Sequence, residues 1–173
     1  MKNIVLIGFM GTGKSSVGKI LARKLGLKFV DVDEVIEKTT GMKISEIFAK
    51  FGEPRFRDIE TEVIKLISQN NRQVIATGGG AILREENFKK LKDKGIIVWL
   101  KASENVILER VKNCKDRPLL QVENPKQKIK ELLTKRIPFY EKADFSINTE
   151  ELTPEEVAEK IIQEYERLKN GKT

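Results

Sequence analysis

Apolar residues along the chain form short continuous runs that alternate with longer segments of helical periodicity. The runs at 3–7, 28–32, 73–76 and 95–100, and a weaker one at 145–147, predict β-strands. Apolar residues spaced three and four positions apart predict helices over 14–25, 55–69, 83–92, 103–111, 125–137 and 154–168. This alternation is typical of a parallel sheet with helices on both faces. We therefore expect a single α/β domain over residues 1–173.

Polar residues at several boundaries support these limits. Residues 153–156 (TPEE) form a capping-box pattern with proline in the first helical position. Asn124 precedes Pro125, and Ser103 precedes the helix predicted after the fourth strand. Asparagine and serine side chains accept hydrogen bonds from the first turn of a helix. These three segments are therefore predicted helix starts.

A phosphate-binding loop follows the first predicted strand. Residues 8–15 read GFMGTGKS, which is a complete G-x-x-x-x-G-K-S pattern between a buried strand and a helix. Backbone N–H groups of such a loop bind nucleotide phosphates, with Lys14 at the phosphates and the Ser15 hydroxyl on Mg²⁺. The alternative is an ordinary glycine-rich turn. We expect these residues at the nucleotide: Gly11, Thr12, Gly13, Lys14, Ser15 and Ser16.

Two stretches depart from the regular alternation. Residues 33–54 hold two short helical patterns around Thr39-Thr40-Gly41, and residues 112–124 are polar and irregular. Insertions beside a phosphate-binding loop are where substrate segments and lids are expected, whereas ordinary surface loops are the alternative.

Two carboxylates follow the second predicted strand. Strand alternation places Asp31 and Asp33 on one face beside the phosphate loop. A kinase that uses Mg²⁺ and ATP needs one carboxylate for metal-bound waters and one that orients the attacking hydroxyl. The alternative for Asp33 is that it caps the following helix.

Aromatic residues and arginine occur together in residues 44–57. Such a combination suggests a pocket with an apolar wall and a carboxylate clamp at Arg57. The alternative places Phe48 and Phe51 in the core and pairs Arg57 with Glu60 or Glu53 on its own helix.

Glycines and arginines provide further candidates. Gly78, Gly79 and Gly80 follow a buried strand, where they expose backbone N–H groups and allow close approach of a ligand. Arg117, in the second irregular stretch, could close over a phosphate, and Arg136 ends a helix. An arginine at a helix end also compensates the helix dipole, which is the alternative.

Composition narrows the classes of partner. The 33 basic and 26 acidic residues give a net charge of +7, but lysines mostly alternate with glutamates and form no long basic tract. No apolar stretch approaches the roughly 18 residues of a membrane span, and the four before Gly8 are too few for a signal peptide. We expect neither nucleic acid nor a membrane as partner. One cysteine excludes an internal disulfide, and we expect a monomer in the cytoplasm.

The chain contains no histidine, so any general base or metal ligand must be a carboxylate, hydroxyl, lysine or water. Phosphoryl transfer asks mainly for positioning and charge neutralisation, which Lys14, Mg²⁺ and Arg117 would supply. Asp33 would accept a hydrogen bond from the attacking hydroxyl. Arg57 and Arg136 would each grip a carboxylate.

Together these segments resemble the shikimate kinase family. The resemblance spans nearly the whole chain in the family's order, and the Arg57–Glu60 pair followed by three glycines is its selective part. The matching segments are the phosphate loop, Asp31-Val32-Asp33, residues 52–57 (GEPRFR) with Glu60, Gly78-Gly79-Gly80, Arg117-Pro118-Leu119-Leu120, Arg136-Ile137-Pro138-Phe139-Tyr140 and Ala143-Asp144.

The resemblance implies a three-layer fold of the nucleoside-monophosphate-kinase type with a five-stranded parallel sheet. Residues 33–60 would form the substrate-binding segment and residues 112–124 the lid. The implied reaction transfers the γ-phosphate of ATP, with Mg²⁺, to the 3-hydroxyl of shikimate. The products would be ADP and shikimate 3-phosphate, on the path to aromatic amino acids.

The resemblance also implies roles for single residues. Arg117 matches the lid arginine, Asp31 matches a residue that holds Mg²⁺ through water, and Arg110 lies near the adenine. Thr77 stands where a common phosphate-loop pattern has a second, aspartate magnesium anchor, and the family usually has a small hydroxyl residue there. The catalytic residues would be Lys14, Asp33 and Arg117. The positions at the substrate are Asp33, Arg57, Gly79, Gly80 and Arg136.

Three other functions are weighed against this one. The first is a kinase of another hydroxy acid, such as gluconate, and a screen of acceptor substrates would distinguish it from a shikimate kinase. A regulatory GTPase is disfavoured, because residues 113–116 (NCKD) place lysine at the wrong position for N-K-x-D and no D-x-x-G occurs. A nucleic-acid-binding module would show salt-sensitive binding to DNA or RNA.

Overall fold

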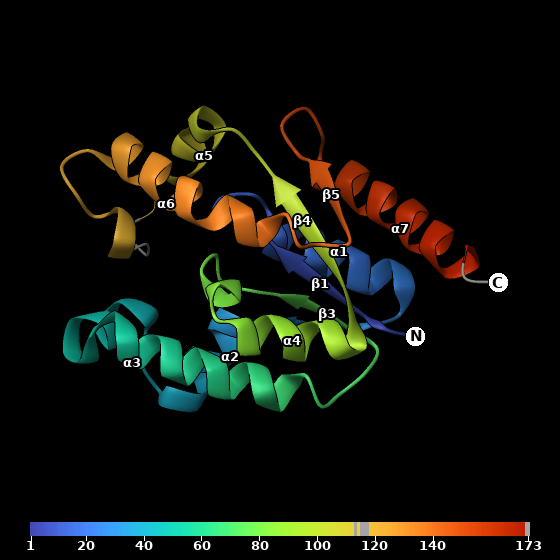
Figure 1. The fold of residues 1–173 in the computed structure, drawn as a ribbon, viewed down its shortest axis with the longest axis horizontal. Coiled ribbons are helices and arrows are strands. Elements are labelled where there is room, and N and C mark those ends of the chain that lie inside the picture. Colours follow the sequence, from blue (N-terminus) through green and yellow to red (C-terminus); the bar gives the residue numbers. More distant parts are fainter. Residues whose placement is uncertain (113, 115–117, 172–173) are drawn as a thin grey trace.

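The computed structural model describes residues 1–112, 114 and 118–171. Five strands form one parallel sheet in the order β2-β3-β1-β4-β5 (Figure 1). The strands are β1 (Asn3–Ile7), β2 (Lys28–Asp31), β3 (Gln73–Ala76), β4 (Gly95–Lys101) and β5 (Phe145–Asn148). The predicted α/β fold and its five strands are therefore confirmed.

Helices cover both faces of this sheet, which gives three layers (Figure 1). One face packs against α1 (Lys14–Leu25) and α7 (Pro154–Asn170), and the other against α2 (Val32–Thr40), α3 (Ile44–Ile67) and α4 (Glu85–Lys94). The remaining helices are α5 (Glu104–Val111) and α6 (Pro125–Tyr140), with short 3₁₀ turns at η1 (Ala81–Leu83) and η2 (Pro118–Leu120).

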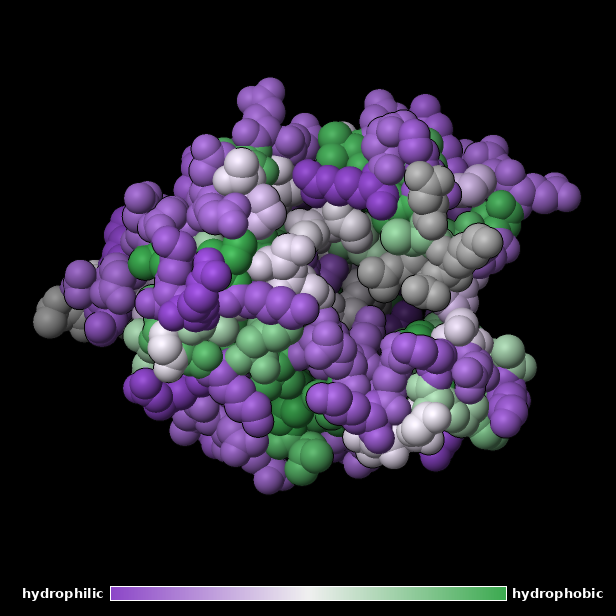
Figure 2. Space-filling model, turned by 180° about the vertical axis from the view of Figure 1, so that it is seen from behind, coloured by the Kyte–Doolittle hydropathy of each residue, from purple (hydrophilic) through white to green (hydrophobic). Residues whose placement is uncertain are grey.

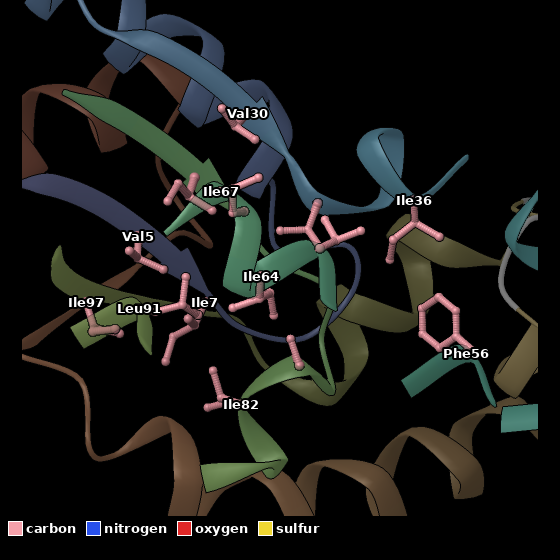
Figure 3. Packing of buried hydrophobic residues seen from close by; sticks show 14 of the residues in the cluster. Val5, Ile7, Val30, Ile36, Phe56, Ile64, Ile67, Ile82, Leu91 and Ile97 are labelled. Atoms are coloured by element: carbon pink, nitrogen blue, oxygen red, sulfur yellow. The ribbon is translucent and has the colours of Figure 1, made fainter. Parts of the chain in front are cut away.

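The central strand β1 is buried on both faces, which explains why its sequence is apolar at every position from 4 to 7. Alternation places Ile4 and Leu6 in the cluster under α1 and α7, and Val5 and Ile7 in the cluster on the opposite face. Figure 3 shows the second cluster, where Ile64 of α3 and Leu91 of α4 approach β1. Burial on both faces fixes β1, and with it the phosphate loop at its carboxyl end.

The predicted helix starts are confirmed by their hydrogen bonds. Ser103 accepts from the Val106 N–H and Asn124 accepts from the Gln127 N–H. Thr153 and Glu156 bond reciprocally as a capping box. None of the helices in the described ranges is long and apolar enough to cross a membrane. Hydrophilic residues predominate on the face in Figure 2, with hydrophobic ones in small separate groups.

The structure refines several sequence-based predictions in detail. Strand β2 ends at Asp31, whose side chain caps α2 by accepting from the N–H groups of Asp33 and Glu34, so Asp33 lies in the first turn of a helix. Helix α3 is interrupted at Gly52, whose backbone is not helical (φ 78°, ψ 169°), so the short helical segment predicted before residue 55 and the helix predicted after it are both present. Phe51 is 56% exposed and does not belong to the core.

Candidate active site

The loop between β1 and α1 lies beside the carboxyl end of β2. The Lys14 Nζ is nearly buried and donates to the carbonyl oxygens of Gly8 and Phe9 at 2.7 and 2.8 Å. The loop, Asp31 and Asp33 line one cavity, as predicted, with Gly11, Gly13, Lys14, Ser15 and Ser16 from the loop and the start of α1. Thr12 differs, because its buried hydroxyl donates to the Phe9 carbonyl and its side chain does not line this cavity.

Ser15 and Asp31 bring two oxygen ligands together in this cavity. The Ser15 hydroxyl donates to Asp31 Oδ2 at 2.6 Å, while Asp31 Oδ1 caps α2. The described residues hold no group of three or more His, Cys, Asp or Glu side chains arranged for a metal. A hydroxyl beside one carboxylate fits Mg²⁺, which keeps several waters and takes phosphate oxygens as ligands.

Arg110 of α5 joins the phosphate loop to the segment after β5. Its Nη1 donates to the Gly11 carbonyl at 3.0 Å and to the Thr149 hydroxyl at 3.3 Å. Arg110 therefore lies beside the phosphate loop, and its position near the adenine stays a prediction. Arg117 of the predicted lid lies outside the described residues, as do Asn113, Lys115 and Asp116.

A second cavity of about 460 Å³, including its part open to solvent, adjoins the first. It gathers all five residues predicted at the substrate, together with an apolar wall. Its lining residues are Met10, Asp33, Ile44, Phe48, Phe56, Arg57, Glu60, Gly78, Gly79, Gly80, Pro118, Leu119 and Arg136. The two cavities share Met10, Asp33, Gly78 and Gly79, so Asp33 lies where they meet.

Arg57 faces this second cavity while paired with Glu60 on its own helix. Arg57 Nη1 lies 2.9 Å from Glu60 Oε1, and the Glu60 side chain is wholly buried. Burial raises the pKa of the Glu60 carboxyl, and the adjacent Arg57 guanidinium opposes this shift. The structure thus combines the two readings of Arg57, since one guanidinium both pairs with Glu60 and lines the pocket.

Arg136 of α6 is a buried cation on the other side of the cavity. It is 2% exposed, and its guanidinium lies over the Phe9 ring at 5.2 Å from the ring centroid. Its Nε and Nη1 have no hydrogen-bond partner among the described residues. A buried cation with unused donors is costly unless an anion pairs with it. The arrangement therefore suits an anionic ligand.

Two glycines make room for these guanidinium groups. A Cβ at Gly79 would lie 2.9 Å from Arg136 Nη1, and a Cβ at Gly80 would lie 2.5 Å from Arg57 Nη2. Any side chain at either position would displace an arginine. The glycine loop therefore fixes how closely both cations approach the backbone.

The apolar wall predicted from the aromatic residues of 44–57 is present. The rings of Phe48 and Phe56 lie 4.8 Å apart between centroids, tilted by 42°, and line the cavity. Two other residues around the cavity were not among the predicted site residues, and the first is Met10 of the phosphate loop, which completes the wall. Tyr140 lies behind the glycine loop and donates to the Gly79 carbonyl. The sequence predicts a helix that ends at residue 137. A helix predicted to continue to Tyr140 would have placed this residue on the same face as Arg136, four positions earlier.

The geometry supports transfer of a phosphoryl group between two ligands. One cavity has a phosphate loop with a lysine and the oxygen ligands of a metal, and the other has two arginines for an anion. A carboxylate at their junction can accept a hydrogen bond from an attacking hydroxyl.

Comparison with known proteins points in the same direction. Residues 10–166 match the family described as shikimate kinase. A curated shikimate kinase of Thermodesulfovibrio yellowstonii is 75% identical over 173 residues, which cover 100% of both chains. Another, from Caldanaerobacter subterraneus, is 49% identical and covers 98% of this chain and 99% of its own.

Solved structures of shikimate kinases are also similar to this chain. The shikimate kinase of Acinetobacter baumannii, in complex with shikimate, has a TM-score of 0.94 at 44% identity, with 98% of this chain and 94% of that chain covered. A gluconokinase from Sinorhizobium meliloti reaches a TM-score of 0.62 at 19% identity, over 96% and 93% of the two chains. The second likeness concerns the fold alone.

Proposed function

This chain belongs to the shikimate kinase family and is an ATP-dependent kinase of shikimate, and we propose that the reaction takes place where the two adjoining cavities meet at Asp33. The observation that carries this proposal is the shared lining of the cavities, which brings a phosphate loop and an anion pocket into contact. The γ-phosphate of ATP would then pass to the 3-hydroxyl of shikimate without either ligand leaving its cavity.

In the substrate cavity, Arg57 and Arg136 bind the carboxylate and hydroxyl groups of shikimate, with the N–H groups of Gly79 and Gly80. The unused donors of buried Arg136 and the fixed position of Arg57 support this role. Asp33 accepts a hydrogen bond from the attacking hydroxyl. A neutral analogue would leave two guanidinium groups unpaired and is rejected for that reason.

In the nucleotide cavity, the phosphates bind to the N–H groups of residues 11–16, and Lys14 exchanges its carbonyl partners for them. Ser15 and Asp31 would hold Mg²⁺, directly and through water. The ion would neutralise phosphate charge. Arg110, anchored to Gly11 and Thr149, lies on the adenine side.

Residues 33–60 serve as the substrate-binding segment and residues 112–124 as the lid, from which Arg117 reaches the transferred phosphoryl group. The support for the first segment is its contribution of Asp33, Arg57 and Glu60 to one cavity. For Arg117 the support is the sequence pattern. We further propose a monomeric enzyme of the cytoplasm, consistent with its single cysteine.

The test is a coupled ADP-release assay with Mg²⁺ and ATP that compares shikimate, gluconate and no acceptor. ADP release that requires shikimate is the expected result. ADP release with gluconate alone, or at the same rate without an acceptor, would overturn the proposal. Arg84→Ala serves as a variant control, because Arg84 pairs with exposed Asp58 away from both cavities.

A further inference from the structure

Tyr140 is the last residue of α6 and lies four positions after Arg136, on the same face of the helix. Its side chain is 1% exposed, and its ring packs against that of Trp99 at 5.6 Å between centroids. The Tyr140 hydroxyl donates to the Gly79 carbonyl oxygen at 2.5 Å. This contact links α6 to the glycine loop across 61 residues of sequence.

The contact controls a peptide group at the substrate cavity. A peptide is planar and trans, so its C=O and N–H point in opposite directions. Anchoring the Gly79 carbonyl behind the loop therefore also fixes the direction of the Gly80 N–H. Glycine has more accessible backbone conformations than other residues, so the loop depends on such an anchor.

Helix α6 thus contacts Gly79 twice. Arg136 Nη1 lies 2.9 Å from the position that a Cβ of Gly79 would take, and the Tyr140 hydroxyl donates to the carbonyl of the same residue. The Arg136 guanidinium and the backbone of Gly79 beside it are therefore both positioned by the same helix, α6.

We propose that Tyr140 is a positioning residue of the substrate site, whose hydroxyl holds the glycine loop in the orientation that binds shikimate beside Arg136. The inference rests on the proposed function of that cavity. Tyr140 touches no reacting atom, and it acts through Gly79 and Gly80.

The hydroxyl is available for this role over the whole pH range of an assay. Burial raises the pKa of Tyr140 to about 12, and the nearby Arg136 guanidinium opposes the shift. The phenol therefore keeps its proton, and the effect of the Tyr140→Phe substitution should not vary with pH.

The first test compares Tyr140→Phe with Tyr165→Phe in steady-state kinetics. Tyr165 is also buried, at 4% exposure, but it belongs to α7 and packs in the cluster on the sheet face away from the cavity. For Tyr140→Phe we expect the KM for shikimate to rise about 3- to 10-fold, the range of one lost hydrogen bond. The KM for ATP should stay unchanged, and Tyr165→Phe should leave both constants unchanged.

Other outcomes overturn the inference in ways that can be separated. Unchanged KM for shikimate in Tyr140→Phe, or a parallel rise in both KM values, would leave Tyr140 a structural residue only. If the wild-type enzyme itself does not turn over shikimate, the proposed function fails rather than the role of Tyr140.

A second measurement keeps the hydroxyl in place. The chain has two tyrosines, so 3-fluorotyrosine in a Tyr165→Phe background labels Tyr140 alone. We expect its ¹⁹F resonance to shift when shikimate is added without nucleotide. A resonance that shikimate does not move would overturn the inference even if Tyr140→Phe fails to fold.

Discussion

Arg57 and Glu60 form a 2.9 Å ion pair in which one partner faces the substrate cavity and the other is wholly inaccessible to solvent. The Glu60 carboxylate accepts a hydrogen bond from the guanidinium and holds it in place. Arg57 is therefore oriented before substrate arrives, which lowers the entropy that binding must overcome.

Arg57→Ala should raise the KM for shikimate far more than the KM for ATP. A charge-assisted hydrogen bond contributes about 1.5–3 kcal/mol, so we expect roughly a 10- to 100-fold rise. The variant also leaves Glu60 as an unpaired buried carboxylate, which costs about 3 kcal/mol of unfolding free energy. Steady-state kinetics and urea unfolding measure the two effects.

Arg84→Ala is the matched control for that variant. Arg84 pairs with exposed Asp58, which lies on α3 next to Arg57. An exposed pair of this kind contributes about 0–1 kcal/mol to stability. Both KM values should stay at the wild-type level. Equal rises in the two KM values of Arg57→Ala would remove Arg57 from the anion site.

Glu60→Gln should change how stability depends on pH. Because burial raises the pKa of Glu60 above 4.5, the folded state binds a proton more tightly than the unfolded state. Glu60 therefore makes stability fall as pH rises from 4.5 through the raised pKa. The unfolding free energy of the wild type minus that of Glu60→Gln should fall over this window. A difference that rises with pH, measured by urea unfolding, would contradict the direction of the shift.

Asp31 has two roles that substitution separates. Asparagine caps a helix as well as aspartate does, so Asp31→Asn should keep the stability of α2 but require more Mg²⁺ for half-maximal activity. Asp31→Ala should show the same Mg²⁺ effect and lose about 1 kcal/mol as well. Magnesium titration at fixed ATP and thermal unfolding measure both. An unchanged requirement for Mg²⁺ in Asp31→Asn would restrict Asp31 to capping.

Arg117→Ala should lower kcat at least about 100-fold, because removing a donor that neutralises transition-state charge has effects of this size. The affinity for shikimate should stay within about twofold, since ground-state binding relies on other arginines. Arg167→Ala is the control, because Arg167 is exposed and pairs with Glu164 on its own helix α7, away from both cavities. Unchanged kcat in Arg117→Ala would make Arg117 a surface residue.

The sequence predicts well what depends on local pattern. The apolar run of β1 with the glycine-lysine motif after it fixes the phosphate loop, and Ser103 and Asn124 mark helix starts through their own hydrogen bonds. Asp33 lies beside the phosphate loop as predicted, but in a helix and not in line with the strand, because alternation holds only while a strand continues. Asp31 ends the strand by capping α2, and the choice between pairing and capping depends on tertiary geometry.

Contacts between segments that are distant along the chain could not be predicted from the periodicity of the sequence. The end of α6 was predicted before Pro138, yet the helix continues to Tyr140, and the Glu141 N–H still donates to the Ile137 carbonyl. That extension brings Tyr140 to Gly79. The stacking of Arg136 on Phe9 likewise joins residues that no periodicity relates.

The close approach of Arg136 to Gly79 and of Arg57 to Gly80 bears on inhibitor design. Every other amino acid would place a Cβ against a guanidinium, so a substitution at either position would move the arginine that faces it. A competitive inhibitor that makes its main contacts with the backbone of this loop could therefore be evaded there only by a change that also shifts Arg57 or Arg136.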